Sequence, residues 1–160
     1  MTARPAPPAA TAGAPRPAPP DPVQARIDAG GAVVLFDGVC SLCNGAVDFI
    51  IRHDPAGRFA FASLQSDEAR AYLEAHGRDA DALLDTVVLA DRDGIHERST
   101  AALRVLRGLG APWVALYALA AVPRPARDAV YRYVAANRYR WFGTRETCRL
   151  PSPEERARFV

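Results

Sequence analysis

The sequence predicts an α/β domain, because short apolar runs typical of buried strands alternate with segments of helical periodicity. Residues 31–36 form an apolar run rich in β-branched and aromatic side chains, which is typical of a buried parallel strand. Residues 58–62 alternate as a second strand, and residues 86–90 form a third. A tight-turn sequence at 91–94 then leads into a short fourth strand at 95–97, so the last two strands are predicted to form a hairpin.

Helical segments connect these strands. From Ser41 to His53, apolar side chains recur every three or four residues, as expected of an amphipathic helix. Ser66 is predicted to cap a second helix and Ser99 a third. The resulting order, β-α-β-α-β-β-α, is that of a thioredoxin-like domain.

A helical extension is expected to follow from about residue 111. Residues 112–122 are apolar on all sides but fall short of the roughly 20 residues that span a bilayer, so they predict a buried helix and no transmembrane segment. A more polar helix is predicted over 127–137, and the chain from Arg138 onward is expected to be irregular. The inner face of that polar helix is predicted to consist of Val130, Tyr133 and Val134.

The start of the chain differs in composition from the rest. Residues 1–22 contain eight of the fourteen prolines of the 160-residue chain and few large apolar side chains, so little burial would offset the entropy of ordering. We expect a disordered tail over 1–22 and one domain over 23–160. The tail lacks the apolar core of a signal peptide. With three cysteines, too few for a disulfide scaffold, the expected location is the reducing cytoplasm.

Two cysteines stand at the junction of the first strand and the first helix, in the run Cys40-Ser41-Leu42-Cys43. A spacing of three residues on a helix allows both thiols to face the same side and to form a disulfide. Unpaired backbone N–H groups at a helix N-terminus stabilise a thiolate. This pattern predicts a dithiol-disulfide oxidoreductase in which Cys40 attacks a substrate disulfide and Cys43 resolves the mixed disulfide.

Asp37 lies three residues before Cys40, at the end of the first strand. Its carboxylate would disfavour a nearby thiolate, yet a buried carboxyl could also relay the proton of Cys43 during the second half of the exchange. The alternative is that Asp37 is a turn residue that holds the following loop in place. Both interpretations place Asp37 at the site.

Two other motifs compete with the redox interpretation. The run 33–38 has the shape of the first motif of haloacid-dehalogenase-type phosphotransferases, but the second acid of that motif is replaced by Val39. A zinc site is the other rival, with Cys40, Cys43 and Cys148 joined by a histidine. One cysteine pair with scattered partners is weak evidence for zinc, so we predict neither a metal nor a cofactor. Cys148 is expected to pack as a small apolar side chain.

Residues 37–44, Asp-Gly-Val-Cys-Ser-Leu-Cys-Asn, resemble the signature of the DCC family, which is described as thiol-disulfide oxidoreductases of thioredoxin-like fold. The blocks 61–66, 99–104 and 137–143 also resemble this family, so the resemblance covers the chain from about Val33 to Phe159. The resemblance implies that Asp37, Cys40 and Cys43 are the catalytic residues.

The substrate side of the site departs from better-known thioredoxin-like enzymes. Those place a cis-proline before the third strand, where this chain has Asp85-Thr86-Val87, so Thr86 is a candidate substrate contact. Ser99 and Thr100 open the helix that, in glutathione transferases, holds the γ-glutamyl end of glutathione. The expected partner is a protein, or a small thiol such as glutathione, that carries a thiol or disulfide.

The alternative function belongs to a different class. Residues 124–149 contain seven arginines and two acids, a net charge of +5, although the whole chain carries only +2. Arginines on a solvated helix face account for such a stretch, so no nucleic-acid partner is expected. In the alternative, the protein is a non-enzymatic module whose segment 124–149 binds a partner or the surface of a membrane.

Overall fold

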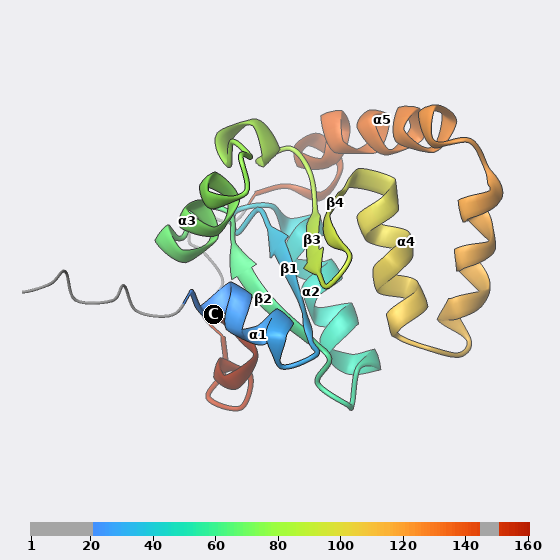
Figure 1. Ribbon diagram of the computed structural model, residues 1–160. Coiled ribbons are helices and arrows are strands. Elements are labelled where there is room, and N and C mark those ends of the chain that lie inside the picture. The colour runs from blue at the N-terminus through green and yellow to red at the C-terminus, as the bar shows by residue number, and fades with distance from the viewer. Residues whose placement is uncertain (1–20, 145–150) are drawn as a thin grey trace, which may run out of the picture.

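A four-stranded mixed sheet forms the centre of the computed structural model, which describes residues 21–144 and 151–160 (Figure 1). The strands are β1 (Ala32–Phe36), β2 (Phe59–Ser63), β3 (Val88–Asp91) and β4 (Gly94–Glu97). In the order β2-β1-β3-β4, β1 runs parallel to β2 and antiparallel to β3, and β3 pairs antiparallel with β4. The α/β class, the buried first strand and the hairpin are therefore confirmed, and the topology is thioredoxin-like.

Helices cover both faces of this sheet. Because side chains alternate along a strand, Val33 and Leu35 of β1 face one apolar cluster while Val34 and Phe36 face the other. The first cluster includes side chains of α1 and α3, and the second includes side chains of α2 and α4. The helix bounds are α1 (Pro22–Asp28), α2 (Ser41–His53), α3 (Asp67–Ala75) and α4 (Arg98–Gly108).

The predicted helix starts are right at two junctions and wrong at the third. Helix α2 begins at Ser41 as expected, and Ser66 caps α3 by accepting the Ala69 N–H at 3.2 Å. Ser99 does not cap α4, because β4 runs directly into this helix, whose N-cap is Glu97. The chain turns at Arg98, which has a left-handed φ of 54°, so the helix starts one residue before Ser99.

Helix α1 was not predicted. Asp21 caps it by accepting the N–H groups of Val23 and Gln24, and Pro22, assigned by composition to the tail, is its first residue. Val23 and Ile27 are buried against the sheet. An Asp-Pro pair followed by two apolar residues four apart is a helix-start pattern. The pattern is hard to recognise here because it directly follows a proline-rich sequence.

The extension contains a 3₁₀ helix, η2 (Trp113–Ala121), beside α4 (Figure 1). The prediction of a buried helix here is wrong, because none of the nine residues of η2 is buried. Trp113 packs edge-on against Phe49, and Arg107 lies over the ring of Tyr117. These contacts cover only the side that faces the domain, so large side chains on the other side stay exposed. The structure also contains η1 (Asp81–Leu83) and η3 (Arg156–Arg158).

Helix α5 (Arg124–Phe142) lies across the end of the sheet and contacts α2 and α4 (Figure 1). It is longer than the predicted helix over 127–137, so the expectation of irregular chain from Arg138 is wrong as far as Phe142. Its predicted inner face is also wrong for Val130 and Tyr133, which are 67% and 64% exposed. The buried residues of α5 are Asp128 and Arg138. Among the described residues, no helix is both long and apolar enough to cross a membrane.

Candidate active site

The two cysteines occupy the first turn of α2, directly after the loop that follows β1. Cys40 is the N-cap residue, and its Sγ accepts the backbone N–H of Cys43 at 3.4 Å. Asn44 fixes the loop by donating from its Nδ2 to the carbonyls of Gly38 (2.9 Å) and Cys40 (2.8 Å). The sequence pattern thus places both thiols at one helix N-terminus, where a backbone N–H points at the first sulfur.

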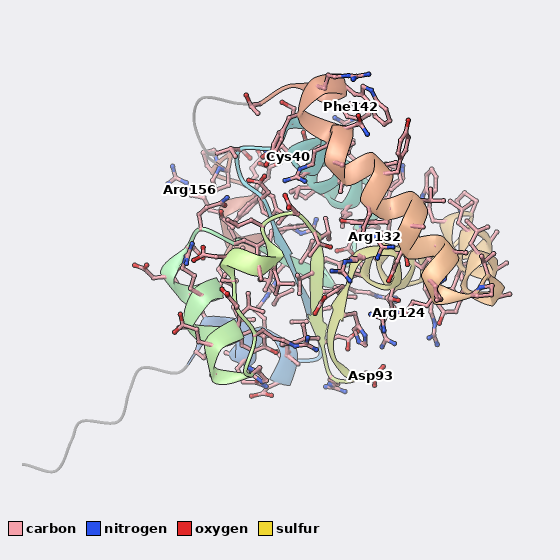
Figure 2. The ribbon with its side chains drawn as sticks, turned by 90° about the horizontal axis from the view of Figure 1, so that it is seen from above. Cys40, Asp93, Arg124, Arg132, Phe142 and Arg156 are labelled. Carbon is pink, nitrogen blue, oxygen red and sulfur yellow. The ribbon has the colours of Figure 1, made fainter. Side chains whose placement is uncertain are left out.

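The two thiols differ in exposure. Cys40 is 0% exposed, whereas Cys43 is only partly buried. Cys40 is covered by the end of α5, because Thr144 forms a β-bridge with it and the Ser41 N–H donates to the Gly143 carbonyl at 3.4 Å. Figure 2 shows Cys40 near the Phe142 end of α5. In this structure Cys40 is therefore closed off from solvent.

The electrostatic surroundings give Cys43 the character of a protonated thiol. Burial raises the pKa of Cys43, and the adjoining Cys40 thiol raises it further by hydrogen bonding and by its charge. The guanidinium of Arg138 lowers this pKa and the carboxylate of Asp37 raises it, but the net shift is strongly upward. Cys43 therefore keeps its proton at neutral pH, which suits a resolving thiol.

Asp37 is buried at the centre of a hydrogen-bond network. Its Oδ1 accepts from the Val39 N–H at 3.1 Å and from Gln65 Nε2 at 2.9 Å. Its Oδ2 accepts from the Tyr139 hydroxyl at 2.5 Å and from Arg138 Nη2 at 3.4 Å. Both oxygens are therefore held by donors from the loop, the end of β2 and helix α5.

This network keeps Asp37 ionised. Burial by itself would raise the pKa of Asp37, but the hydrogen bonds from Tyr139, Val39, Gln65 and Arg138 outweigh it and lower the pKa below its usual value. A proton relay requires a carboxyl that is readily protonated near neutral pH. The geometry therefore favours Asp37 as a fixed negative charge that positions the loop and Arg138 over its predicted use as a relay.

Arg138 connects α5 to the thiol pair. It is 4% exposed, and its Nη2 donates to Asp37, to Asp85 Oδ1 at 3.1 Å and to the Leu84 carbonyl at 3.3 Å. Burial lowers the pKa of Arg138, but the surrounding acceptors raise it above its ordinary value, so the guanidinium stays charged. A buried charge within the field of both thiols is a direct means of stabilising a thiolate.

Sequence reasoning missed Arg138, Tyr139 and Gln65 as site residues. Their blocks, 61–66 and 137–143, resemble the DCC family, but helical periodicity predicts no charged inner face on this part of the chain. An arginine next to a tyrosine gives no local signal of burial. The pairing of both residues with Asp37, about 100 residues earlier in the sequence, is visible only in the fold.

The three predicted substrate contacts separate into two groups. Thr86 lies near the pair, accepts the Arg98 N–H at 3.1 Å and lines a cavity together with Cys43. Ser99 is buried and donates its hydroxyl to Asp128 Oδ1 at 2.5 Å, so a carboxylate of the chain itself occupies the start of α4. Thr100 lines neither this cavity nor the one next to it. The carboxylate of Asp128 therefore occupies the position at Ser99 where the sequence predicts the γ-glutamyl end of glutathione.

The structure tests the alternative of a zinc site only in part, because it does not describe all of the candidate ligands. Cys148 lies outside the described residues. Within residues 21–144 and 151–160, no three or more His, Cys, Asp or Glu side chains are grouped so as to hold a metal ion.

The sheet order β2-β1-β3-β4 is that of a thioredoxin-like fold. The Cys-x-x-Cys pair lies where β1 leads into the N-terminus of α2, which is the position of the dithiol in thioredoxin-like proteins. The family model of DCC1-like thiol-disulfide oxidoreductases matches residues 34–144, and the chain belongs to this family. This confirms the resemblance seen in the sequence.

Two relatives extend the comparison. The chain is 47% identical to the uncharacterized protein YuxK of Bacillus subtilis over 128 residues, which covers 80% of this chain and 93% of that protein. It is 38% identical over 119 residues to a chloroplastic DCC family protein of Arabidopsis thaliana, which covers 74% of this chain and 69% of that protein. No solved structure matches.

Proposed function

We propose that the protein is a dithiol-disulfide oxidoreductase whose redox centre is the pair Cys40 and Cys43. The observation that carries the proposal is the position of Cys40 as N-cap of α2, where its sulfur accepts the Cys43 N–H. In the first step the Cys40 thiolate attacks one sulfur of a substrate disulfide, which forms a mixed disulfide and releases one substrate thiolate. That thiolate takes up a proton as it leaves.

In the second step Cys43 loses its proton to solvent or to a departing thiolate and attacks the Cys40 sulfur. This breaks the mixed disulfide, forms a disulfide between Cys40 and Cys43, and releases the second substrate thiol. The substrate disulfide gains two electrons and the protein dithiol loses two, so a reducing dithiol of the cell must regenerate the pair. The low cysteine content of the chain supports a reducing, cytoplasmic location for this cycle.

The remaining site residues act on these two sulfurs. The guanidinium of Arg138 stabilises negative charge in the pair, and Asp37 holds Arg138 and the loop before Cys40 in position. Gly143 allows the chain to turn over Cys40, since its φ of 76° and ψ of −179° form a conformation that is open essentially only to glycine.

The test is a redox titration of the full-length protein in glutathione buffers, followed by alkylation and mass measurement of the free thiols. We expect one reversible two-electron transition in the wild type and none in Cys40→Ser or Cys43→Ser. Cys148→Ser is the matched control and should retain the transition. If the wild type shows no such transition, or if Cys40→Ser still reduces disulfides, the proposal is wrong.

A second candidate function rests on the outer surface of the extension. Large apolar side chains of η2 and of α5, and that of Val122 between them, are 40% or more exposed, and α5 also carries Arg124, Arg127, Arg132 and Arg140. They are Val114, Leu116, Leu119, Val122, Val130, Tyr133, Tyr139, Trp141 and Phe142. Exposed aromatic and aliphatic groups next to arginines are typical of helices that bind anionic membrane surfaces.

Co-sedimentation with vesicles that contain anionic or only zwitterionic lipids tests this candidate. We expect binding to the anionic vesicles alone, and its loss in Trp141→Ser/Phe142→Ser. Equal binding to both vesicles, or none to either, contradicts it, and a concentration-dependent dimer would assign the surface to a second copy of the chain.

A further inference from the structure

Two adjoining cavities lie between α5 and the cysteine pair. The smaller, of about 200 Å³, is bordered by Cys43 and mostly apolar groups, among them Ala46, Val87 and Val134. The larger, of about 480 Å³, is bordered by the polar side of α5. Thr86, Tyr131, Asp85, Ala135 and Arg138 border both. The Cys43 side of the thiol pair thus borders an apolar pocket that continues into a polar one.

Next to these cavities, the polar groups to which an extended polypeptide could hydrogen-bond already have partners within the chain. The Val87 N–H, just before β3, donates to the Tyr131 hydroxyl at 2.8 Å. At the start of α4, Ser99 is bonded to Asp128. Because α5 supplies both partners, an extended protein substrate cannot pair with this stretch of backbone while α5 is in place.

The size of the apolar pocket also favours a small substrate over an extended polypeptide. Sites for drug-sized ligands are usually about 300–1,000 Å³, so a pocket of about 200 Å³ next to Cys43 takes only a short aliphatic arm. A small disulfide can place one such arm in the pocket and its sulfur beside Cys43, the thiol next to Cys40.

Three arginines supply positive charge to the larger cavity. Arg98 and Arg132 both border it, and within the described part of the chain neither makes an ion pair (Figure 2 labels Arg132 on α5). The third is Arg138, whose buried Nε lacks a hydrogen-bond partner among the described residues. The acidic side chain that borders the larger cavity is Asp85, which is bonded to Arg138, and Asp37 pairs with Arg138 as well.

The backbone at Arg98 supports a role in binding. Its φ of 54° is left-handed, a conformation that is strained for a non-glycine residue and that clusters at functional sites. Its N–H is held by Thr86 Oγ1 at 3.1 Å and the Val87 carbonyl at 3.2 Å. Glycine or asparagine would fit this turn with less strain, yet the chain has an arginine that borders the cavity.

We propose that these cavities bind a low-molecular-weight disulfide whose short aliphatic arms end in carboxylates. One arm fills the apolar pocket beside Cys43, and a carboxylate is bound by Arg98 and Arg132 with the free Nε–H of Arg138. Guanidinium groups pair with carboxylates through charge-assisted, often bidentate hydrogen bonds. This proposal rests on the proposed function: the pair is oxidised to its disulfide while the bound disulfide is reduced to two carboxylate-bearing thiols.

The experiment uses three disulfides whose arms each contain two methylene groups: 3,3′-dithiodipropionate, bis(2-hydroxyethyl) disulfide and cystamine, which are anionic, neutral and cationic. The second-order rate of oxidation of the reduced full-length protein is divided by the rate for dithiothreitol with the same disulfide, which removes differences in intrinsic reactivity. In the wild type, we expect the normalised rate to be about tenfold higher for the dicarboxylate than for the neutral disulfide.

Variants distinguish this site from a general effect of charge. In Arg98→Gln/Arg132→Gln, the preference for the dicarboxylate should disappear while the rate with the neutral disulfide stays within about twofold. Arg140→Gln, on the same helix but outside both cavities, is the control and should behave as wild type. A circular dichroism melt of each variant confirms that it is folded.

The possible failures are separable. If none of the three disulfides oxidises the wild-type pair, the proposed function fails. If the neutral disulfide reacts but the dicarboxylate has no normalised advantage, or if Arg140→Gln loses as much as the double variant, the oxidoreductase stands and the carboxylate site is wrong.

Discussion

The domain formed by the sheet with α1 to α4 and the extension formed by η2 and α5 are built in opposite ways. In the domain, apolar side chains such as Phe61 and Leu73 are fully buried against both faces of the sheet. In α5, the buried residues are Asp128 and Arg138, and Val130 faces solvent. The domain is therefore stabilised mainly by removing apolar surface from water, and α5 is attached to it largely through polar contacts.

This difference explains where the site lies. A buried ion pair contributes little net stability, because the cost of desolvating the charges offsets their attraction. The same contacts place Arg138 and Tyr139 next to Asp37 and the cysteine pair. The contacts of α5 therefore bring polar and charged groups to the thiols more than they add stability.

The largest expected effect compares the two regions directly. Phe61→Ala empties a fully buried position in β2 and should lower the free energy of unfolding by about 4 kcal/mol. Leu119→Ala, at a position that is 53% exposed in η2, should change it by less than about 0.5 kcal/mol. Urea denaturation followed by circular dichroism measures both. Similar losses would show that η2 is covered in solution.

An intermediate effect is expected at the boundary between the two regions. Arg138→Met removes a buried charge and leaves Asp37 with three donors, so it should cost about 2–3 kcal/mol of unfolding free energy. Arg140→Met, which is exposed on the same helix, is the matched control and should cost less than about 0.5 kcal/mol. Equal costs in urea titrations would mean that the contact with Asp37 does not stabilise the docking of α5.

The smallest effect is a change in pH dependence. Because the pKa of Asp37 is lowered in the folded state, its ionisation stabilises the fold above the unfolded pKa, and this contribution is lost as the pH falls below about 3.8. The Asp37→Asn variant lacks this ionisable group and therefore has no such contribution to lose. The urea midpoint of the variant should fall less between pH 6 and pH 3 than that of the wild type. The exposed Glu154→Gln should follow the wild type. A fall in Asp37→Asn as large as in the wild type would contradict the lowered pKa.

The domain was largely predictable because its signals are local. The apolar run 31–36, the periodicity of 41–53 and the turn at 91–94 each specify an element without reference to distant residues. Apart from α1 and the start of α4, the errors lie in the extension, where apolar character does not bring burial. In η2 and α5, exposure depends on how much neighbouring structure is available to cover each side, and a single adjacent element covers only one side.

The sequence by itself determined the strand-helix order and the cysteine pair at a helix N-terminus, because periodicity and spacing act over a few residues. Tertiary structure decided that the end of α5 covers Cys40, that Asp128 fills the start of α4, and that Arg138 reaches Asp37. These contacts join residues 29 to 104 positions apart. Which distant groups meet depends on how α5 packs across the sheet, and no local pattern encodes that.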